Sequence, residues 1–275
     1  MKKLVNGLIF VFCLGSALFA QKIPEGRELP ALVVDFATDK NSWSESNLVK
    51  VDPMSDEYAV SGYVVQKNII GYIKQSYTVT INKDNNDLNI SVSDMNSIAC
   101  DKEGKVLNRA SVIKNPASTE VKLAGLIKDD LSERISHWTD EEYEEKYLKA
   151  CSYPEFIYQL TKSSSKLYAT KFFEKNVNGK TVEVEVALNS IDENINPVTR
   201  KVEELQYKVE GSVQIVKNAN SGSVITEPFT ISIYSNNDKL LSAKIGSIYK
   251  AKGIANIKPL SSGLDTFWIY TIEEK

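Results

Sequence analysis

The hydrophobic period of this chain changes twice, and this change constrains the fold more than any other feature. Apolar and polar side chains alternate in steps of two over 77–81 and 88–92, as they do in β-strands with one buried face. Between 121 and 160 the apolar side chains recur every three or four residues, which is typical of amphipathic helices. From 181 onward the step of two returns. We therefore expect an α+β chain in which helices separate two strand-rich parts.

The N-terminal strand-rich part contains the clearest hairpin. Its last two strands flank an island of Asn and Asp at 83–87, and these residues favour turns. The island is not expected to bind calcium, because Leu88 interrupts the alternating oxygen ligands of an EF-hand loop. This part predicts an antiparallel sheet. The predicted strands are 29–37, 58–65, 69–81 and 88–98.

Three helices are predicted after this sheet. Thr139 and Glu142 have the spacing of a capping box, and Ser152 and Glu155 repeat that spacing around Pro154. The polar run 161–165 then indicates a domain boundary. The apolar stripe of the first helix is expected to be Val121, Ala124, Ile127, Leu131, Ile135 and Trp138.

The C-terminal part predicts a small antiparallel barrel, preceded by one more helix around Leu167 and Phe173. Residues 181–188 alternate strictly, and strands of similar character follow at 206–216, 229–234, 248–257 and 266–272. The domain plan is therefore a segment 1–20, an α+β domain over 21–162 and a β-barrel domain over 163–275.

An aromatic alternation lies in the last strand, where Trp268 and Tyr270 share one face and Phe267 and Ile269 share the other. One pair should line the core. The other pair, for which we take Trp268 and Tyr270, is either covered by a helix or forms an exposed aromatic platform. Helix cover is the more common arrangement, because large exposed apolar patches are rare on monomers.

The first twenty residues have the pattern of a secretory signal. Lys2 and Lys3 precede an apolar stretch that ends in small residues, and cleavage is expected after Ala20, with Ala17 as the competing site. An uncleaved membrane anchor is the alternative for this segment. We expect export to the periplasm or the exterior of a bacterium, and no integral membrane segment in the mature chain.

The charge balance argues against nucleic-acid binding. The formal net charge is −3, and without Lys2 and Lys3 it becomes −5. A mildly acidic protein has no general attraction to phosphate backbones.

Three cysteines occur in the chain. Cys13 follows Phe12 inside the apolar stretch, which is the wrong context for lipidation. Cys100 and Cys151 remain in the mature chain, where they form either a disulfide, worth about 4 kcal/mol for a loop of that length, or two buried thiols.

The sequence predicts no catalytic residue, cofactor or metal site. His137 is the single histidine, so two-histidine metal motifs are excluded, and it is expected to lie at a helix end. Glu141 and Glu145 share a helix face that is expected to be solvated. Gly179-Lys180-Thr181 looks like the end of a phosphate loop but precedes a strand, so we interpret it as a hairpin turn.

Short motifs in the C-terminal half carry a family resemblance. A Leu167-Tyr168 pair leads through Asn176 to Gly179-Lys180 and an alternating strand, and Gly246 precedes a later strand. This half resembles bacterial tRNA-anticodon-binding-like OB domains, which implies an OB-like β-barrel. The loop 195–205 departs from that pattern. Glu183 and Glu185 on the first strand oppose the nucleic-acid binding that the name would suggest.

The N-terminal half, with strands followed by helices, resembles secreted domains of unknown function with a TATA-binding-protein-like fold. These observations together predict an exported, non-enzymatic binding protein, or one associated with the cell envelope, whose partner is an envelope protein or ligand and not a nucleic acid. Two alternatives stay open: a carboxylate-based hydrolase acting on envelope glycans, which needs no histidine, and a structural module of an envelope complex.

Overall fold

The computed structural model describes residues 29–69, 71–84, 87–108, 110–218, 225–262 and 265–274, and the expected signal segment 1–20 lies outside them. The chain divides into two compact units, of which the first ends at Tyr147 and the second begins at Leu148. This division falls inside helix α4 (Asp140–Ser152). The polar run 161–165, where the sequence predicts a boundary, instead joins two helices of the second unit.

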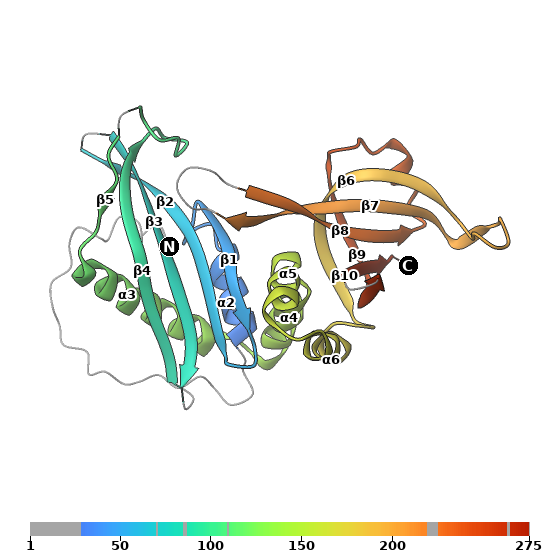
Figure 1. Ribbon diagram of the computed structural model, residues 1–275, viewed down its shortest axis with the longest axis horizontal. Helices are drawn as coiled ribbons and strands as arrows, with labels where there is room; N and C mark the ends of the chain where they lie inside the picture. The colour runs from blue at the N-terminus through green and yellow to red at the C-terminus, as the bar shows by residue number, and fades with distance from the viewer. Residues whose placement is uncertain are drawn as a thin grey trace. The chain divides into compact units, whose positions relative to one another are not determined.

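The first unit contains a five-stranded antiparallel sheet with helices packed on it (Figure 1). Helix α2 (Leu29–Thr38) contacts β1, β2 and β3, and helix α3 (Ala117–His137) contacts β4. This bears out the sheet-and-helix architecture expected for the N-terminal part. The strands, in sheet order, are β1 (Glu45–Asp52), β2 (Glu57–Asn68), β3 (Gly71–Asp84), β4 (Asp87–Cys100) and β5 (Ile113–Lys114).

The predicted hairpin is confirmed in β3 and β4, which pair antiparallel from Tyr72 opposite Cys100 to Asp84 opposite Asp87. Its buried face follows the alternation in the sequence. Tyr77, Val79 and Ile81 are buried, and the hydroxyl-bearing residues between them face the other way.

The prediction of a strand at 29–37 is wrong, because this segment forms helix α2. Its residues are apolar on almost every side, and eight of its ten side chains are buried, so neither a helical nor a strand period is visible in the sequence. Pro30 fits the first turn of a helix, where its missing N–H has no partner to lose.

The predicted stripe of α3 is partly wrong. The buried positions are Leu123, Ile127, Leu131 and Ile135, which follow one another at intervals of four residues, together with Ser132. Val121 is 72% exposed, because two residues correspond to about 200° around the helix from Leu123.

Helix α4 begins as predicted. The Thr139 N–H donates to Glu142 Oε2 (2.9 Å), and the Glu142 N–H donates to Thr139 Oγ1 (3.2 Å), which is a reciprocal capping box. The second predicted box is wrong. Ser152 ends α4 and its hydroxyl donates to the Leu148 carbonyl, while the next helix begins after Tyr153 without a side-chain cap.

The second unit is a closed five-stranded barrel with helices beside it, as the alternation in the sequence predicts (Figure 1). The strand order is β10-β8-β7-β6-β9, in which β8 and β10 pair parallel and the other pairs are antiparallel. Helix α5 contacts β7, and α6 contacts β9. The elements are α5 (Pro154–Ser163), α6 (Lys166–Asn176), β6 (Thr181–Ile195), β7 (Val202–Asn218), β8 (Ile225–Ser235), the 3-10 helix η3 (Asp238–Ser242), β9 (Ile248–Ser262) and β10 (Asp265–Glu273).

The barrel interior is apolar and narrow. Val184, Val209 and Ile231 are among its buried side chains. A Cβ added at Gly211 would lie 2.3 Å from Val186 Cγ2, so only glycine lets β7 approach β6 this closely.

Among the helices of the described segments, none has both the length and the apolar character that crossing a bilayer requires.

Candidate functional site

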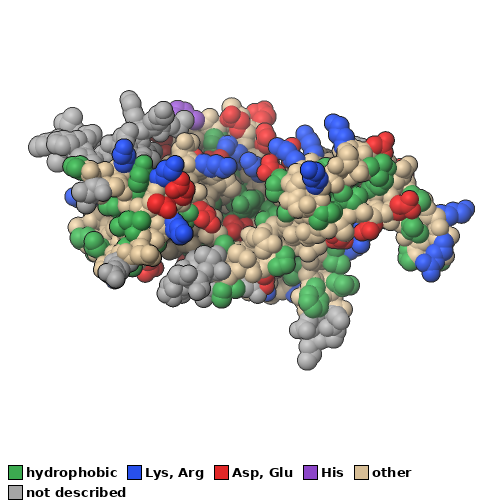
Figure 2. Space-filling model, turned by 90° about the horizontal axis from the view of Figure 1, so that it is seen from above, with side chains coloured by type: hydrophobic (Ala, Val, Ile, Leu, Met, Phe, Trp, Pro, Cys, Tyr) green, Lys and Arg blue, Asp and Glu red, His purple; other side chains and the backbone are tan. Residues whose placement is uncertain are grey.

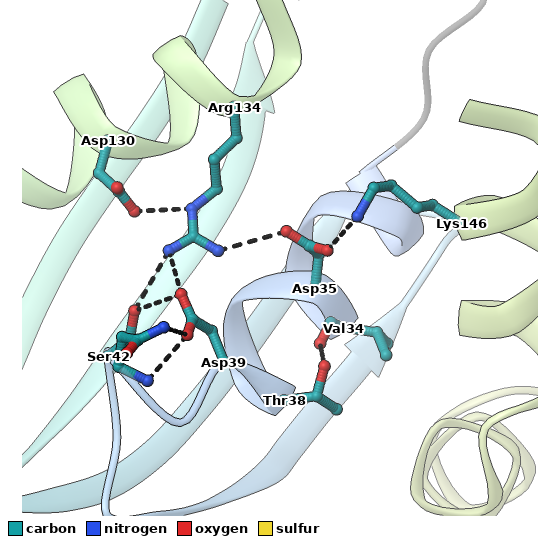
Figure 3. Close-up of polar contacts among 9 residues, drawn as sticks. Val34, Asp35, Thr38, Asp39, Ser42, Asp130, Arg134 and Lys146 are labelled. Carbon is teal, nitrogen blue, oxygen red and sulfur yellow. Dashed lines mark hydrogen bonds and ion pairs between the residues drawn. The ribbon is translucent and has the colours of Figure 1, made fainter. Parts of the chain in front are cut away.

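The densest group of charged side chains in the first unit surrounds Arg134 on α3 (Figure 3). All three guanidinium nitrogens donate to carboxylates. Nε bonds Asp130 at 2.8 Å, Nη1 bonds Asp35 at 3.2 Å and Nη2 bonds Asp39 at 2.6 Å. Nη2 also lies 3.2 Å from Ser42 Oγ. We call these side chains, together with Lys146, the Arg134 cluster.

Lys146 extends the cluster to a third helix. Its ammonium group on α4 pairs with the second oxygen of Asp35, and it lies 4.9 Å from the ring centroid of Trp138. Asp35 therefore holds cations from α3 and α4 at once. The cluster joins α2, the turn that follows it, α3 and α4 around one guanidinium group.

Burial and hydrogen bonds act in opposite directions on Asp39. Burial alone would raise the pKa of this carboxyl, but bonds from the Asn41 N–H and from Arg134 outweigh it and hold the pKa below its ordinary value. The guanidinium of Arg134 is affected in the complementary way. Burial opposes its charge, whereas Asp130 and Asp39 favour it, and the pKa of Arg134 is raised.

This arrangement is suited to holding helices together and not to acid–base chemistry. A general acid near neutral pH needs a carboxyl whose pKa is raised, as by an apolar pocket. The carboxyls of Asp39, Asp52 and Glu183 have their pKa values lowered. Each of the three carboxylates in the cluster is already held by a bond to Arg134, and Asp35 is also held by Lys146, so we assign the cluster a structural role.

The second unit offers a polar surface on the outer side of β7 and β8. Glu210 accepts the Ser232 hydroxyl with both oxygens at 3.0 Å and pairs with Lys208 at 2.9 Å. Thr230 and Gln214 on the same side of the strands are exposed. We call this surface the β7–β8 face.

A further polar group lies at the start of β9. The Tyr249 hydroxyl donates to Glu274 Oε2 at 2.6 Å and accepts from Asn237 Nδ2 at 3.3 Å. Glu274 Oε1 accepts the Lys252 N–H at 3.0 Å. Burial, followed by the bond to Glu274, raises the pKa of Tyr249. These bonds tie the end of the chain and the segment before η3 to β9.

The predicted aromatic pair lies on the inner side of β10. Tyr270 is fully buried, and its hydroxyl donates to the Ser152 carbonyl at 3.2 Å. Trp268 meets Phe173 of α6 edge to face, with ring centroids 5.5 Å apart. The exposed aromatic side chain of this strand is Phe267, which is 57% exposed.

The two cysteines lie in different units. Cys100 is on β4 and Cys151 is on α4, and both are buried thiols and not half-cystines in this structure. Burial, followed by the neighbouring Asp101, raises the pKa of the Cys100 thiol, which makes it a weak nucleophile.

The other residues that the sequence analysis considered for catalysis or metal binding lie at exposed positions on helices. His137 is the last residue of α3 and is exposed. Glu141 and Glu145 on α4 are exposed too. Trp43 is buried and contacts the rings of Phe36 and Tyr77.

The described residues contain no group of three or more His, Cys, Asp or Glu side chains arranged to hold a metal ion. In comparisons with known proteins, no family model matches the chain, and no curated protein is significantly similar to it.

Proposed function

We propose that this protein is an exported, non-enzymatic binding protein of the cell envelope, and that its barrel is an OB-like module carrying the binding surface. The observation that carries the proposal is the closed five-stranded barrel with a polar outer surface on two adjacent strands. The signal pattern of residues 1–20 supports export.

The strand order supports the interpretation of the barrel as an OB-like module. An OB fold is a five-stranded Greek-key barrel that binds ligands on its second and third strands and on the loops beside them. Counted from β6, the second and third strands are β7 and β8. The exposed hydroxyls and amides of the β7–β8 face suit hydrogen bonding to a polar ligand, such as a glycan or an extended peptide.

The charges on the barrel argue against a nucleic acid as that ligand. Glu183 on β6 pairs with Lys250 at 2.7 Å, and Glu210 on the β7–β8 face pairs with Lys208. Cations that are already paired with carboxylates offer little attraction to a phosphate backbone.

Site-specific photo-crosslinking in cells tests the proposal. A photo-reactive side chain replaces Thr230 on the β7–β8 face or, as the matched control, Asn256 on β9, which is exposed and lies on the opposite side of the strand order. We expect crosslinked envelope material at position 230 and little at 256.

Purified protein incubated with glycan fragments from the envelope should leave them unshortened. Equal crosslinking at both positions would contradict the proposed surface. Shortened glycans whose formation stops after a single carboxylate substitution would favour the hydrolase.

A further inference from the structure

A second surface lies outside the β7–β8 face, on the connection between β8 and β9 and on the first residues of β9. Residues 239–252, which we call the basic–apolar segment, contain four lysines and neither Asp nor Glu, although the whole chain has a net charge of −3. Three of its aliphatic side chains point into solvent. Leu241 is 70% exposed, Ile245 61% and Ile248 67%.

The segment is fixed in place and not a loose loop. Leu240 is buried and anchors η3. The Gly246 N–H donates to the Leu188 carbonyl at 2.7 Å, and the Leu188 N–H donates to the Ser247 carbonyl at 3.0 Å. Tyr249 is held by Glu274. The exposed aliphatic side chains are thus presented by an ordered backbone, and burying them against another surface would cost little conformational entropy.

Part of the positive charge is available for a partner. Lys250 is paired with Glu183, but Lys239 and Lys244 form no ion pair within the described part of the chain, and both are exposed. They flank Leu241 in the sequence, and Lys244 directly precedes Ile245. Figure 2 shows Lys and Arg side chains beside hydrophobic ones on the surface of the barrel.

This composition favours a lipid surface over a protein. The buried centres of protein interfaces are rich in Tyr, Trp and Arg and poor in Lys. Surfaces that bind membranes peripherally combine aliphatic side chains with Lys, because the ammonium groups contact anionic headgroups while the apolar groups enter the interfacial region.

We propose that the basic–apolar segment docks the barrel on the surface of an anionic phospholipid bilayer. Leu241, Ile245 and Ile248 would enter the headgroup region, while Lys239 and Lys244 contact the phosphates. This inference rests on the proposed function only in that the envelope supplies such a surface.

Sedimentation of the full mature chain with vesicles tests the proposal. Vesicles of equal parts phosphatidylglycerol and phosphatidylcholine are compared with vesicles of phosphatidylcholine alone. We expect binding to the anionic vesicles that weakens as salt is added, and much weaker binding to the neutral ones. Leu241→Asp combined with Ile245→Asp should reduce the partition coefficient about tenfold or more. Lys239→Glu combined with Lys244→Glu should reduce binding and remove most of its salt dependence.

Val198 provides the matched control, since it is 87% exposed in the turn between β6 and β7, where Lys201 follows it closely. Val198→Asp combined with Lys201→Glu should leave binding unchanged. Circular dichroism and thermal unfolding confirm that every variant folds, which we expect because all the substituted side chains are exposed.

Wild-type protein that fails to bind anionic vesicles would overturn the proposal, as would equal loss of binding in the control variant. Capture of an envelope protein that depends on Leu241 and Ile245, without vesicle binding, would also overturn it in favour of a protein partner. Vesicle binding is measured on pure protein, so its failure is distinct from a failure of the crosslinking on the β7–β8 face.

Discussion

At the scale of single residues, Arg134 is the side chain that joins three carboxylates of the first unit. Arg134→Ala would leave Asp35, Asp39 and Asp130 close together without their shared cation. Because the side chain is only 18% exposed, we expect the free energy of unfolding to fall by about 2–4 kcal/mol, less than for a fully buried pair.

Urea unfolding of the two proteins measures this difference. Lys122→Ala on the same helix is the control, since Lys122 is exposed and should change stability by less than about 0.5 kcal/mol. Equal effects of the two substitutions would contradict the structural role of the cluster.

The lowered pKa of Asp39 predicts that its contribution to the free energy of unfolding depends on pH in the acid range. Its pKa in the folded protein lies below the ordinary value of 3.8. When the pH falls to about 3.8 and lower, the unfolded chain therefore binds more protons than the folded chain. The stability that Asp39 contributes is therefore complete above 3.8 and is lost as the pH falls through the lower, folded pKa.

Asp39→Asn should unfold more easily at neutral pH and show a flatter decline in acid than the wild type. Urea midpoints measured over a pH series test this. A variant whose decline in acid is as steep as that of the wild type would show that Asp39 does not contribute.

Only part of the Arg134 cluster could be predicted from the sequence. Asp130 and Arg134 are four residues apart, which is the spacing of an ion pair on a helix. Asp35 and Asp39 lie 99 and 95 residues from Arg134. They reach it only because 29–38 is a helix packed beside α3, and the sequence predicts a strand there.

At the scale of elements, the two predicted capping boxes show what a local motif can determine. Thr139 and Glu142 form theirs, whereas Ser152 is taken up by the preceding helix. The spacing is the same in both, so the difference comes from where α4 ends, which the motif does not encode.

Thr139→Ala should lower the free energy of unfolding by about 1 kcal/mol, because it removes the side-chain acceptor for the Glu142 N–H. Glu142→Gln is the control, since glutamine keeps the reciprocal bond of the box. Thermal unfolding of the three proteins measures the effect. A loss in the control as large as that in Thr139→Ala would assign the effect to charge and not to capping.

Strands with one buried face were the elements best predicted, because alternation is visible over short stretches such as 181–188. Helix α2 could not be predicted, because a segment with almost all of its side chains buried shows no hydrophobic periodicity. The sequence also does not show which strands pair with one another. The parallel pairing of β8 with β10, which closes the barrel, depends on contacts between segments far apart in the chain.

At the scale of the whole molecule, counting the reactive cysteines tests both whether Cys100 and Cys151 are free and whether the signal segment is removed. Cys100 and Cys151 are buried in separate units, so alkylation of these two thiols in the native protein should be slow. Unfolding without a reductant should give two adducts by mass spectrometry. Recovery of no adducts would indicate a disulfide, and a third adduct would indicate that Cys13 is retained.

The intact mass of the protein recovered from fractionated cells decides whether this protein is exported. We expect a chain in the envelope or exported fraction that begins at Gln21, or at Leu18 if the competing site is used. Recovery of the chain in the cytosol with residues 1–20 still attached would contradict it.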